Sequence, residues 1–429
     1  MTRRTAALIT PNAVHWDDGL VRGVTDEMGE HGRYDIGQVL EMMARRTTGR
    51  ECTVLIRNCQ VHELRGAPRI ERDWKYTKIG PWTTYRRDGR RVHVGLVDQL
   101  DPGRFLLGDA ANDHPAVLTL NLATYQRIVG AAWSATAGTA GIGLLREHYL
   151  SNKEGQQPLW HRKQPGFLGG VGDIRWKRQP TPMERRTLPY VHQYDITAAY
   201  LSAAAQAILA WGKLERTGPI PFDASTAGYW EIAVPDNQAI RVREGGPAVV
   251  PAQLIRKGST WVTSPVLAFL MEMGRKPDVL DSWTCPDWTT ETGEHVQGSR
   301  RWLRWWGEKL RDARKKAHGT DLALAVKRTP NEAIGLMGRE GGRCYMLDVR
   351  DTVIDLLRCN LLRKIYTIGS ATGRWPLRVN VDAVYYPSDT TVPSALGGVV
   401  DLDTDTPTMG HLRYIGLSGI SEYVGGVAA

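Results

Sequence analysis

The chain has 429 residues, of which 42% are hydrophobic and 24% charged, the balance of an ordinary globular protein with two or three domains. No apolar run approaches the ~20 residues that a membrane-spanning helix needs, which excludes that class and predicts no membrane partner. The formal net charge is +9, with 42 Arg against 13 Lys, and favours an acidic partner such as nucleic acid. A GC-rich genome would also raise Arg, so charge alone does not decide the partner.

The five cysteines are scattered and odd in number, without CxxC pairs or a histidine at zinc spacing. This usage is typical of reduced thiols in a cytosol. The basic N-terminal segment has too short an apolar run for a signal peptide. We therefore expect a cytoplasmic protein.

In chain order, residues 1–150 predict an α/β domain, with strands at 52–58 and 90–100 and a helix at 122–133. A polar segment rich in Gly and Pro follows, and residues 151–185 are interpreted as a linker. From there a strand and a helix, a β-rich middle and a helix at 264–274 lead to a basic helical pair. Residues 376–429 are rich in strands and turns.

A single acidic residue, Asp195, lies at the edge of an apolar stretch in "HQYDITAAYLSAAA" (192–205). One explanation is that Asp195 caps a helix that buries Ala199 and Tyr200. The other is that the carboxylate has a chemical role. The stretch by itself favours the cap.

A second lone acid, Asp382, lies within the apolar strand "LRVNVDAVYYPSD" (377–389). An unpaired carboxylate there is costly. Asp382 is therefore either paired with a nearby arginine at the end of the strand or part of a site.

Between the two acids lies a basic helical pair, "RDARKKAHGTDLALAVKRTPNEAIG" (311–335). Pro330 is expected to kink the second helix or to delay its start. Solvated basic faces are the common form of such helices. Alternatively, side chains spaced near multiples of a helical turn offer cations to a ligand: Arg311, Lys315, Lys327 and Asn331.

Two strand-borne carboxylates with a cationic helix are typical of a nucleotidyl-transfer site. Asp195 and Asp382 would hold two Mg²⁺ (or Mn²⁺) ions through oxygen ligands. One ion would activate a hydroxyl nucleophile and the other would stabilise the pyrophosphate leaving group. The cations on the helices would bind the β- and γ-phosphates.

The motifs resemble those of B-family DNA polymerases, most closely the protein-primed branch of phages and linear plasmids. "DITAAYL" is similar to motif A (DxxSLYP) at Asp195 and Tyr200. "KRTPNEAIG" is similar to motif B (KxxxNSxYG) at Lys327, Asn331 and Gly335. "RVNVDAV" is similar to motif C (YxDTDS), with Asp382 as the second acid and Asn380 in place of the first.

The resemblance covers residues 160 to about 390 and implies roles for further residues. "FLGG" stands where the family has its YxGG linker, which implies DNA contacts by Phe167, Gly169 and Gly170. Tyr200 would exclude the 2′-hydroxyl of a ribonucleotide. Lys315 lies where the family has another triphosphate-binding lysine. The implied partners are a DNA primer-template, dNTPs and, in the protein-primed branch, a terminal protein.

The implied fold is α/β (α+β): an RNase H-like exonuclease-type domain, then a polymerase palm with a helical fingers insertion. The expected domains are a degenerate exonuclease-like domain (1–150), the linker (151–185), palm (186–295), fingers (296–345) and palm with a short tail (346–429).

Two parts of the family pattern are degenerate. The exonuclease acids are replaced, with "ITPNAV" for the first motif, Asn58 and His62 for the second, and Tyr125 and Val129 for the third. We therefore expect no proofreading. No lysine follows Lys364, and the last 47 residues hold five acids and one Arg, so the thumb is expected to be reduced or absent.

Two functions remain open. The first is a template-directed, non-proofreading DNA polymerase of a mobile element. The second is a catalytically weak, polymerase-derived DNA-binding protein of replication initiation or telomere-end maintenance. Retention of Asp195, Tyr200, Lys327, Asn331 and Asp382 favours the first, whereas loss of the first motif C acid and of the thumb favours the second. An unrelated nuclease lacks the clustered acids it would need.

Overall fold

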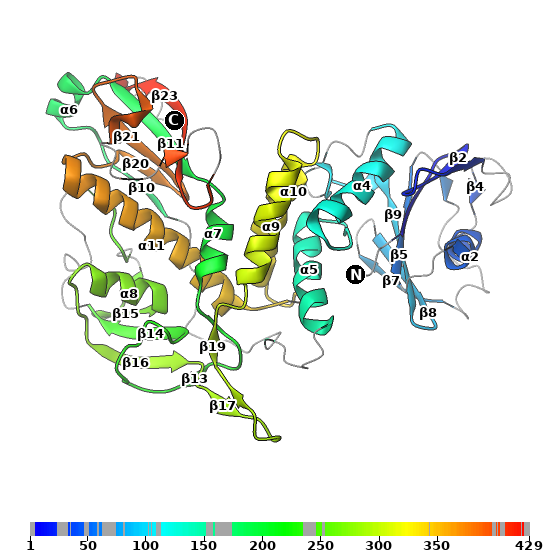
Figure 1. Cartoon of the computed structure of the whole chain (residues 1–429), viewed down its shortest axis with the longest axis horizontal. Helices are drawn as coiled ribbons and strands as arrows, with labels where there is room; N and C mark the ends of the chain where they lie inside the picture. The colour runs from blue at the N-terminus through cyan, green and yellow to red at the C-terminus, as the bar shows by residue number, and fades with distance from the viewer. Residues whose placement is uncertain are drawn as a thin grey trace. The chain divides into compact units, whose positions relative to one another are not determined.

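The computed structural model in Figure 1 forms two compact units, residues 1–154 with 312–333, and residues 155–311 with 334–429. The residues that the structure describes are 5–23, 33–34, 36–46, 51–57, 60–61, 74–79, 82–101, 103, 105–108, 113–151, 158, 174–234, 246–250, 254–342, 344–396, 400, 402–403, 408–421 and 423.

The first unit contains a seven-stranded mixed sheet in the order β3-β2-β1-β5-β9-β8-β7. β1 runs antiparallel to β2 and parallel to β5, β5 runs parallel to β9, and β7, β8 and β9 form an antiparallel meander. The strands are β1 (Thr5–Ile9), β2 (Ala13–Trp16), β3 (Val21–Gly23), β5 (Glu51–Ile56), β7 (Lys75–Ile79), β8 (Trp82–Arg87) and β9 (Arg90–Leu96). A separate pair joins β4 (Arg33–Tyr34) and β6 (Gln60–Val61).

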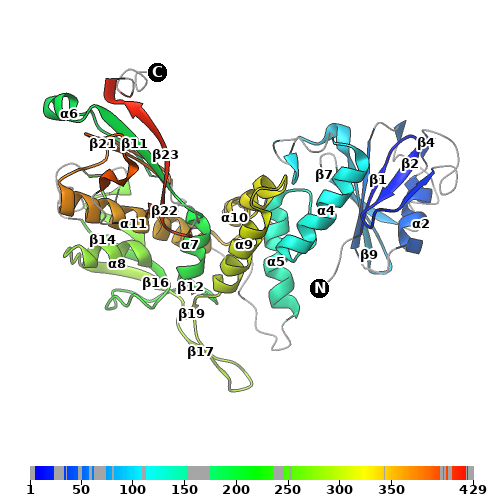
Figure 2. The ribbon, with the colours of Figure 1, turned by 45° about the horizontal axis from the view of Figure 1, so that its top comes forward.

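Alternation of side chains along these strands gives the sheet two faces. One face packs against α2 (Ile36–Arg46), which lies beside the sheet in Figure 2. This core includes Ile9, Trp16, Val54 and Val94. The other side of β1 and β2 is in contact with α4 (Pro115–Val129), and α5 (Ala137–Ser151) follows.

Two helices extend into this unit from the middle of the chain, α9 (Arg304–Ala317) and α10 (Ala323–Met337). α9 is amphipathic, because Trp306, Leu310, Ala313 and Ala317 recur at helical spacing and are buried. Pro330 lies inside α10, which begins at Ala323, so a delayed start is wrong.

Tyr125 on α4 is fully buried, and its hydroxyl lies 2.7 Å from Thr329 Oγ1 on α10. Burial raises the pKa of the Tyr125 phenol far above its usual value. Thr329 in turn donates to the carbonyl of Ala325. The tyrosine of the supposed third exonuclease motif therefore has a structural role here.

A Tyr125→Phe variant is expected to lose about 1 kcal/mol of unfolding free energy, because it removes one buried hydrogen bond without creating a large cavity. Urea denaturation measures this loss. An unchanged midpoint and slope would show that the hydroxyl pair contributes nothing.

The second unit contains a six-stranded sheet in the order β10-β20-β21-β11-β23-β22. All neighbours are antiparallel except β22 and β23. The strands are β10 (Arg175–Lys177), β11 (Tyr190–Ile196), β20 (Arg378–Asn380), β21 (Ala383–Ser388), β22 (Leu402–Asp403) and β23 (Leu412–Gly419). Short helix α6 (Pro182–Thr187) precedes β11, and α7 (Ala199–Gln206) follows it.

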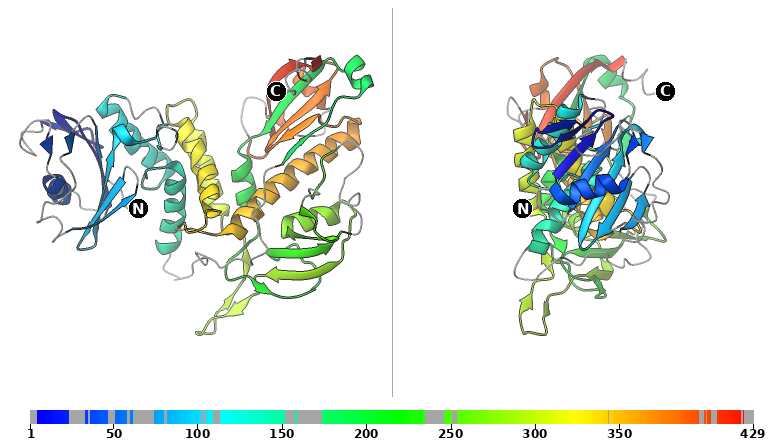
Figure 3. Two further views of the ribbon diagram at one scale, coloured as in Figure 1. Left: turned by 180° about the vertical axis from the view of Figure 1, so that it is seen from behind. Right: turned by 90° about the vertical axis from the view of Figure 1, so that its right-hand side faces the viewer.

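Helix α11 (Leu347–Thr372) lies between this sheet and a second sheet, as Figures 1 and 3 show. The second sheet has the order β13-β16-β14-β15. Helix α8 (Ser264–Glu272) contacts strands β14 and β15 of this sheet and also contacts α11. The strands of this sheet are β13 (Glu215–Arg216), β14 (Gly228–Ala233), β15 (Ser259–Thr263) and β16 (Val279–Thr284). Two further pairs join β12 (Leu209–Ala210) to β19 (Ser299–Arg300) and β17 (Trp288–Thr289) to β18 (His295–Val296).

Buried acids join α11 to the second sheet. Tyr229 on β14 donates to Asp351, and Thr263 on β15 donates to Asp355 at 2.7 Å. Asp355 also accepts from Arg358 one helical turn later, at 3.5 Å. The two buried carboxylates are tolerated because each accepts hydrogen bonds from neighbouring side chains.

The mixed α/β class predicted from the sequence is confirmed. In the part of the chain that the structure describes, no helix is both long and apolar enough to cross a bilayer. The predicted domain boundaries and the reduced thumb remain predictions.

Candidate active site

Asp195 is the last residue but one of β11 and lies at one end of the six-stranded sheet. Its neighbour in register on β21 is Ala383, and the backbone N–H of Ile196 donates to the carbonyl of Asp382 at 3.1 Å. Asp195, on β11, and Asp382, in the turn that leads into the adjacent strand β21, therefore lie at the same end of the sheet. Both are half-buried.

Asp382 belongs to a two-residue turn that joins β20 to β21, because Asn380 pairs with Ala383. Val381, the first residue of this turn, has φ = +60°. A β-branched residue rarely adopts this left-handed conformation, which costs of order 1–3 kcal/mol. The Val381 N–H donates to Ile174 O at 2.8 Å, which helps to hold the turn.

A second left-handed residue lies beside Asp195. Ala198 has φ = +52° and is the N-cap of α7, so the chain turns sharply from β11 into the helix. The helix-cap explanation for Asp195 is wrong: Asp195 is a strand residue, and the cap position belongs to Ala198, which makes no side-chain cap. Strained residues of this kind cluster at functional sites.

Asp195 has a partner that the sequence did not predict. Arg413 lies opposite it on β23 and donates from Nη2 to Oδ2 at 2.9 Å and from Nε to Oδ1 at 3.3 Å. The side chains of Asp195 and Arg413 are 25% and 46% exposed, so solvent screens the pair. An arginine pair at this sheet end is thus observed for Asp195.

Asp195 and Asp382 are the residues that could hold a magnesium ion at this end of the sheet. Mg²⁺ is commonly held by one or two carboxylates together with substrate phosphates. A carboxylate has about four lone-pair sites, and Arg413 uses two of those on Asp195. Among the described residues, no group of three or more His, Cys, Asp or Glu side chains is arranged to hold a metal ion.

Known structures with a similar fold were found. Phi29 DNA polymerase complexed with primer-template DNA and incoming nucleotide substrates aligns at a TM-score of 0.51 and 11% identity, over 97% of this chain and 85% of that one. The chain has a DNA-polymerase-like fold. An orthorhombic crystal form of Phi29 DNA polymerase aligns at a TM-score of 0.48 and 11% identity, over 96% of this chain and 85% of that one. The family B DNA polymerase of the hyperthermophilic archaeon Pyrobaculum calidifontis aligns at a TM-score of 0.34 and 12% identity, over 92% of this chain and 54% of that one.

No protein-family model matches the sequence, and no curated protein sequence matches it. At 11–12% identity the likeness concerns the fold alone. The roles of the candidate residues therefore depend on their own geometry.

The candidate nucleotide-binding residues are divided between the two units. Arg311 belongs with Asp195 and Asp382 to the second unit, and Lys315, Lys327 and Asn331 belong to the first. Lys327 and Asn331 lie one turn apart on the exposed side of α10, and Lys315 is exposed on α9. Tyr200 is half-buried in the first turn of α7.

Some predicted residues cannot be located. Phe167, Gly169 and Gly170 of the FLGG motif lie outside the described residues, as do Asn58 and His62. Val129 is buried as the last residue of α4.

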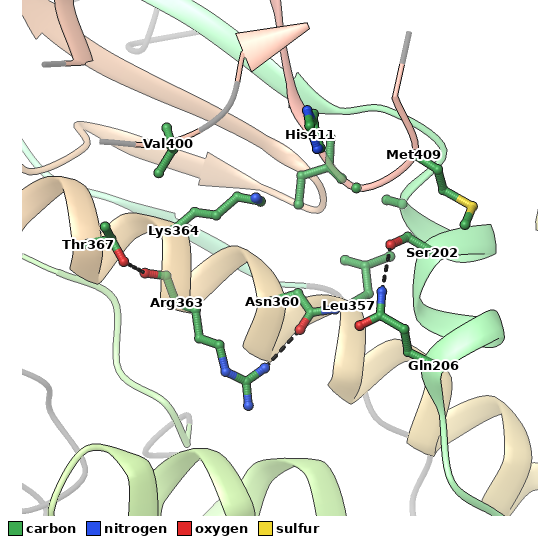
Figure 4. A pocket seen from close by; sticks show the side chains of 13 residues that line it. Ser202, Gln206, Leu357, Asn360, Arg363, Lys364, Thr367, Val400, Met409 and His411 are labelled. Atoms are coloured by element: carbon green, nitrogen blue, oxygen red, sulfur yellow. Dashed lines mark hydrogen bonds between the residues drawn. The ribbon is translucent and has the colours of Figure 1, made fainter. Parts of the chain in front are cut away.

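A cavity of about 450 Å³ opens in the second unit beside α7 and α11 (Figure 4). Ser202 and Gln206 line it from α7, and Arg363 and Lys364 from α11, with His411 across from them. The charge of Arg363 is balanced by a bidentate salt bridge with Glu272, in which Nε and Nη2 donate to the two carboxylate oxygens at 2.7 and 2.8 Å. Neither Asp195 nor Asp382 lines the cavity, but Ile196, which follows Asp195 in the chain, does.

Sequence reasoning missed Arg413. One signal existed: it is the single arginine among the last 47 residues and lies within the strand-like segment "HLRYIGL". Its pairing with a residue 218 positions away leaves no local trace.

Proposed function

We propose that the chain is a template-directed DNA polymerase in which Asp195 and Asp382 form the centre of nucleotidyl transfer. The observation that carries this proposal is the meeting of the two carboxyl-bearing residues at one sheet end, beside the strained residues Val381 and Ala198. The polymerase-like fold supports the same class of partners, primer-template DNA and dNTPs.

In this proposal Asp195 and Asp382 hold Mg²⁺ or Mn²⁺ together with the nucleotide phosphates. The bound ions would supply charge stabilisation and a more acidic hydroxyl nucleophile. Tyr200 would contact the sugar of the incoming nucleotide. Arg311, Lys315, Lys327 and Asn331 would bind the triphosphate, because phosphoryl transfer draws most of its catalysis from positioning and charge neutralisation.

We also propose that the polymerase does not proofread. The described part of the first unit provides no cluster of three acidic or other metal-binding side chains. A 3′–5′ exonuclease of the two-metal type needs such a cluster.

Primer extension tests the proposed function. A labelled DNA primer on a template of known sequence is incubated with one dNTP at a time and with Mg²⁺ or Mn²⁺. Incorporation of only the complementary nucleotide supports a template-directed polymerase. Absence of extension with every primer and ion, in a protein that binds the DNA, contradicts it.

The Arg413–Asp195 pair and Asn380 favour the second candidate, a polymerase-derived DNA-binding protein. The Arg413 guanidinium occupies the carboxylate of Asp195, and Asn380 supplies an amide where the motif has an acid. Both features weaken metal binding. For this candidate, DNA affinity is expected to be identical in the wild type and in Asp195→Asn, and neither protein should extend a primer.

Arg413→Ala is expected to raise Mn²⁺ affinity by about fivefold or more, because a positive charge a few ångströms from the ion costs about 1–4 kcal/mol. Free Mn²⁺ measured by electron paramagnetic resonance in the presence of dNTP gives the affinity without any turnover. Arg413→Lys keeps the charge and serves as the control. Equal affinity in the alanine variant and the wild type would show that Arg413 does not compete with the ion.

Lys327→Ala is expected to raise the apparent KM for dNTP by about tenfold and to leave DNA affinity unchanged, because a charged contact to the triphosphate is lost. Steady-state extension and fluorescence anisotropy measure the two quantities. Lys316→Ala, which removes another exposed lysine, is the control. Weaker DNA binding with a normal KM would assign Lys327 to the nucleic-acid backbone instead.

A further inference from the structure

A group of basic side chains lies in the first unit where two parallel strands end. Arg57 follows β5 directly, and its N–H donates to the carbonyl of Ile9, the last residue of β1, at 3.0 Å. Arg57 therefore stands just beyond the carboxyl ends of both strands. In open α/β sheets this is the edge at which ligands bind.

Two histidines adjoin Arg57. His15 lies on β2 opposite Leu8, and His114 is the N-cap of α4. Their ring centroids are 6.1 Å apart and their planes are nearly perpendicular, at 85°. Arg57 Nη1 donates to the carbonyl of Asp113 at 2.6 Å, which brings the guanidinium next to His114.

Hydrogen bonding determines what His114 offers. Its Nδ1 accepts the backbone N–H of Ala116 at 3.3 Å, so the ring proton of the neutral form resides on Nε2. His114 is exposed, and it can therefore present Nε2–H as a donor at the surface. The positive end of the α4 dipole adds to the potential there.

His15 is in an unfavourable environment without a ligand. Burial, the neighbouring His114 and the Arg57 guanidinium each lower the pKa of His15, which favours its neutral form. Its Nδ1 is buried without a hydrogen-bond partner. An arginine beside two imidazoles, one of them with an unsatisfied buried nitrogen, is a pattern of functional sites rather than of cores.

We infer that His15, Arg57 and His114 bind a phosphate group of a nucleic-acid strand. An anion is attracted by the guanidinium of Arg57, and guanidinium and imidazole N–H groups are suitable phosphate donors. The exposure of His114 leaves the site open at the surface, which suits a phosphate that is part of a chain. This inference does not depend on catalysis by Asp195 and Asp382.

The test combines two probes on the full chain, inorganic phosphate by calorimetry and a labelled oligothymidylate by anisotropy across a salt series. The variant is Arg57→Gln with His114→Asn, since asparagine keeps an N-cap acceptor for α4. The variant is expected to bind both inorganic phosphate and the oligothymidylate at least about tenfold more weakly than the wild type. It is also expected to reduce the salt slope for the strand by about 0.7 per lost phosphate contact.

Arg127→Gln is the matched control, because it removes an exposed arginine from the same helix, α4. His15→Gln, which leaves the strand-end contacts of Arg57 in place, provides a second variant should the first unfold in thermal denaturation. It too is expected to weaken both probes. If only the binding of inorganic phosphate is lost and the salt slope for oligothymidylate binding is unchanged, the assignment to a nucleic-acid strand is overturned. Equal losses in Arg127→Gln, or no loss in either variant, would overturn the site.

Discussion

An Asp382→Asn variant is expected to lose primer extension by about 10³-fold, while its fold and its DNA affinity stay close to those of the wild type. Removal of one preorganised charged group at a reacting centre costs on this order. Asp382 lies with Asp195 at the sheet end, and no group of three or more metal-binding side chains is present among the described residues to take over its role. Asparagine keeps the shape of the side chain in the strained turn but removes its charge and replaces one acceptor oxygen by a donor.

The control for this variant is Asp389→Asn, which removes an acid one residue beyond the end of the same strand, β21. Asp389 is exposed and pairs with Arg374 at 2.9 Å, an interaction of little energetic weight. Single-nucleotide incorporation rates and anisotropy with primer-template DNA are compared for the three proteins. Extension by Asp382→Asn at more than a tenth of the wild-type rate would contradict the assignment of Asp382 to the catalytic centre.

Asp355→Ala is expected to destabilise the protein by about 3–5 kcal/mol, because it leaves Arg358 buried without its counter-charge. Asp355 and Arg358 are 3% and 6% exposed, and both lie on α11 between the two sheets. The same substitution removes the hydrogen bond from Thr263, which ties α11 to β15. Chemical denaturation of the second unit measures the loss, and Glu308→Ala in an exposed pair with Arg304 is the control.

The pH dependence provides an independent check on Asp355. Burial raises the pKa of this carboxyl above its ordinary value of 3.8. The native state then binds a proton more tightly than the unfolded state, so the contribution of Asp355 to stability is complete below about pH 4 and falls as the pH rises through the native pKa. Asp355→Ala is expected to abolish that part of the decline. An equally steep decline in the variant would assign it to other groups.

Local patterns predicted much of the element content. The alternation of residues in β11, the valines of β20 and β21 and the amphipathic spacing of α9 are properties of neighbouring residues, so periodicity alone indicates them. Asp195 and Asp382 could also be singled out from the sequence, because an isolated acid in an apolar stretch is costly wherever the chain folds. The mixed α/β class followed from these elements.

The tertiary structure alone decided which of these elements are neighbours and what their side chains meet. The order β20-β21-β11-β23 brings Arg413 to Asp195 across 218 residues, and residues 312–333 pack with the first unit through contacts such as Tyr125 with Thr329. The cluster of His15, Arg57 and His114 likewise joins a strand, a strand end and a helix cap. Such pairings depend on sheet order and helix packing, which are set by the burial of surfaces distant in sequence, and no local periodicity encodes them.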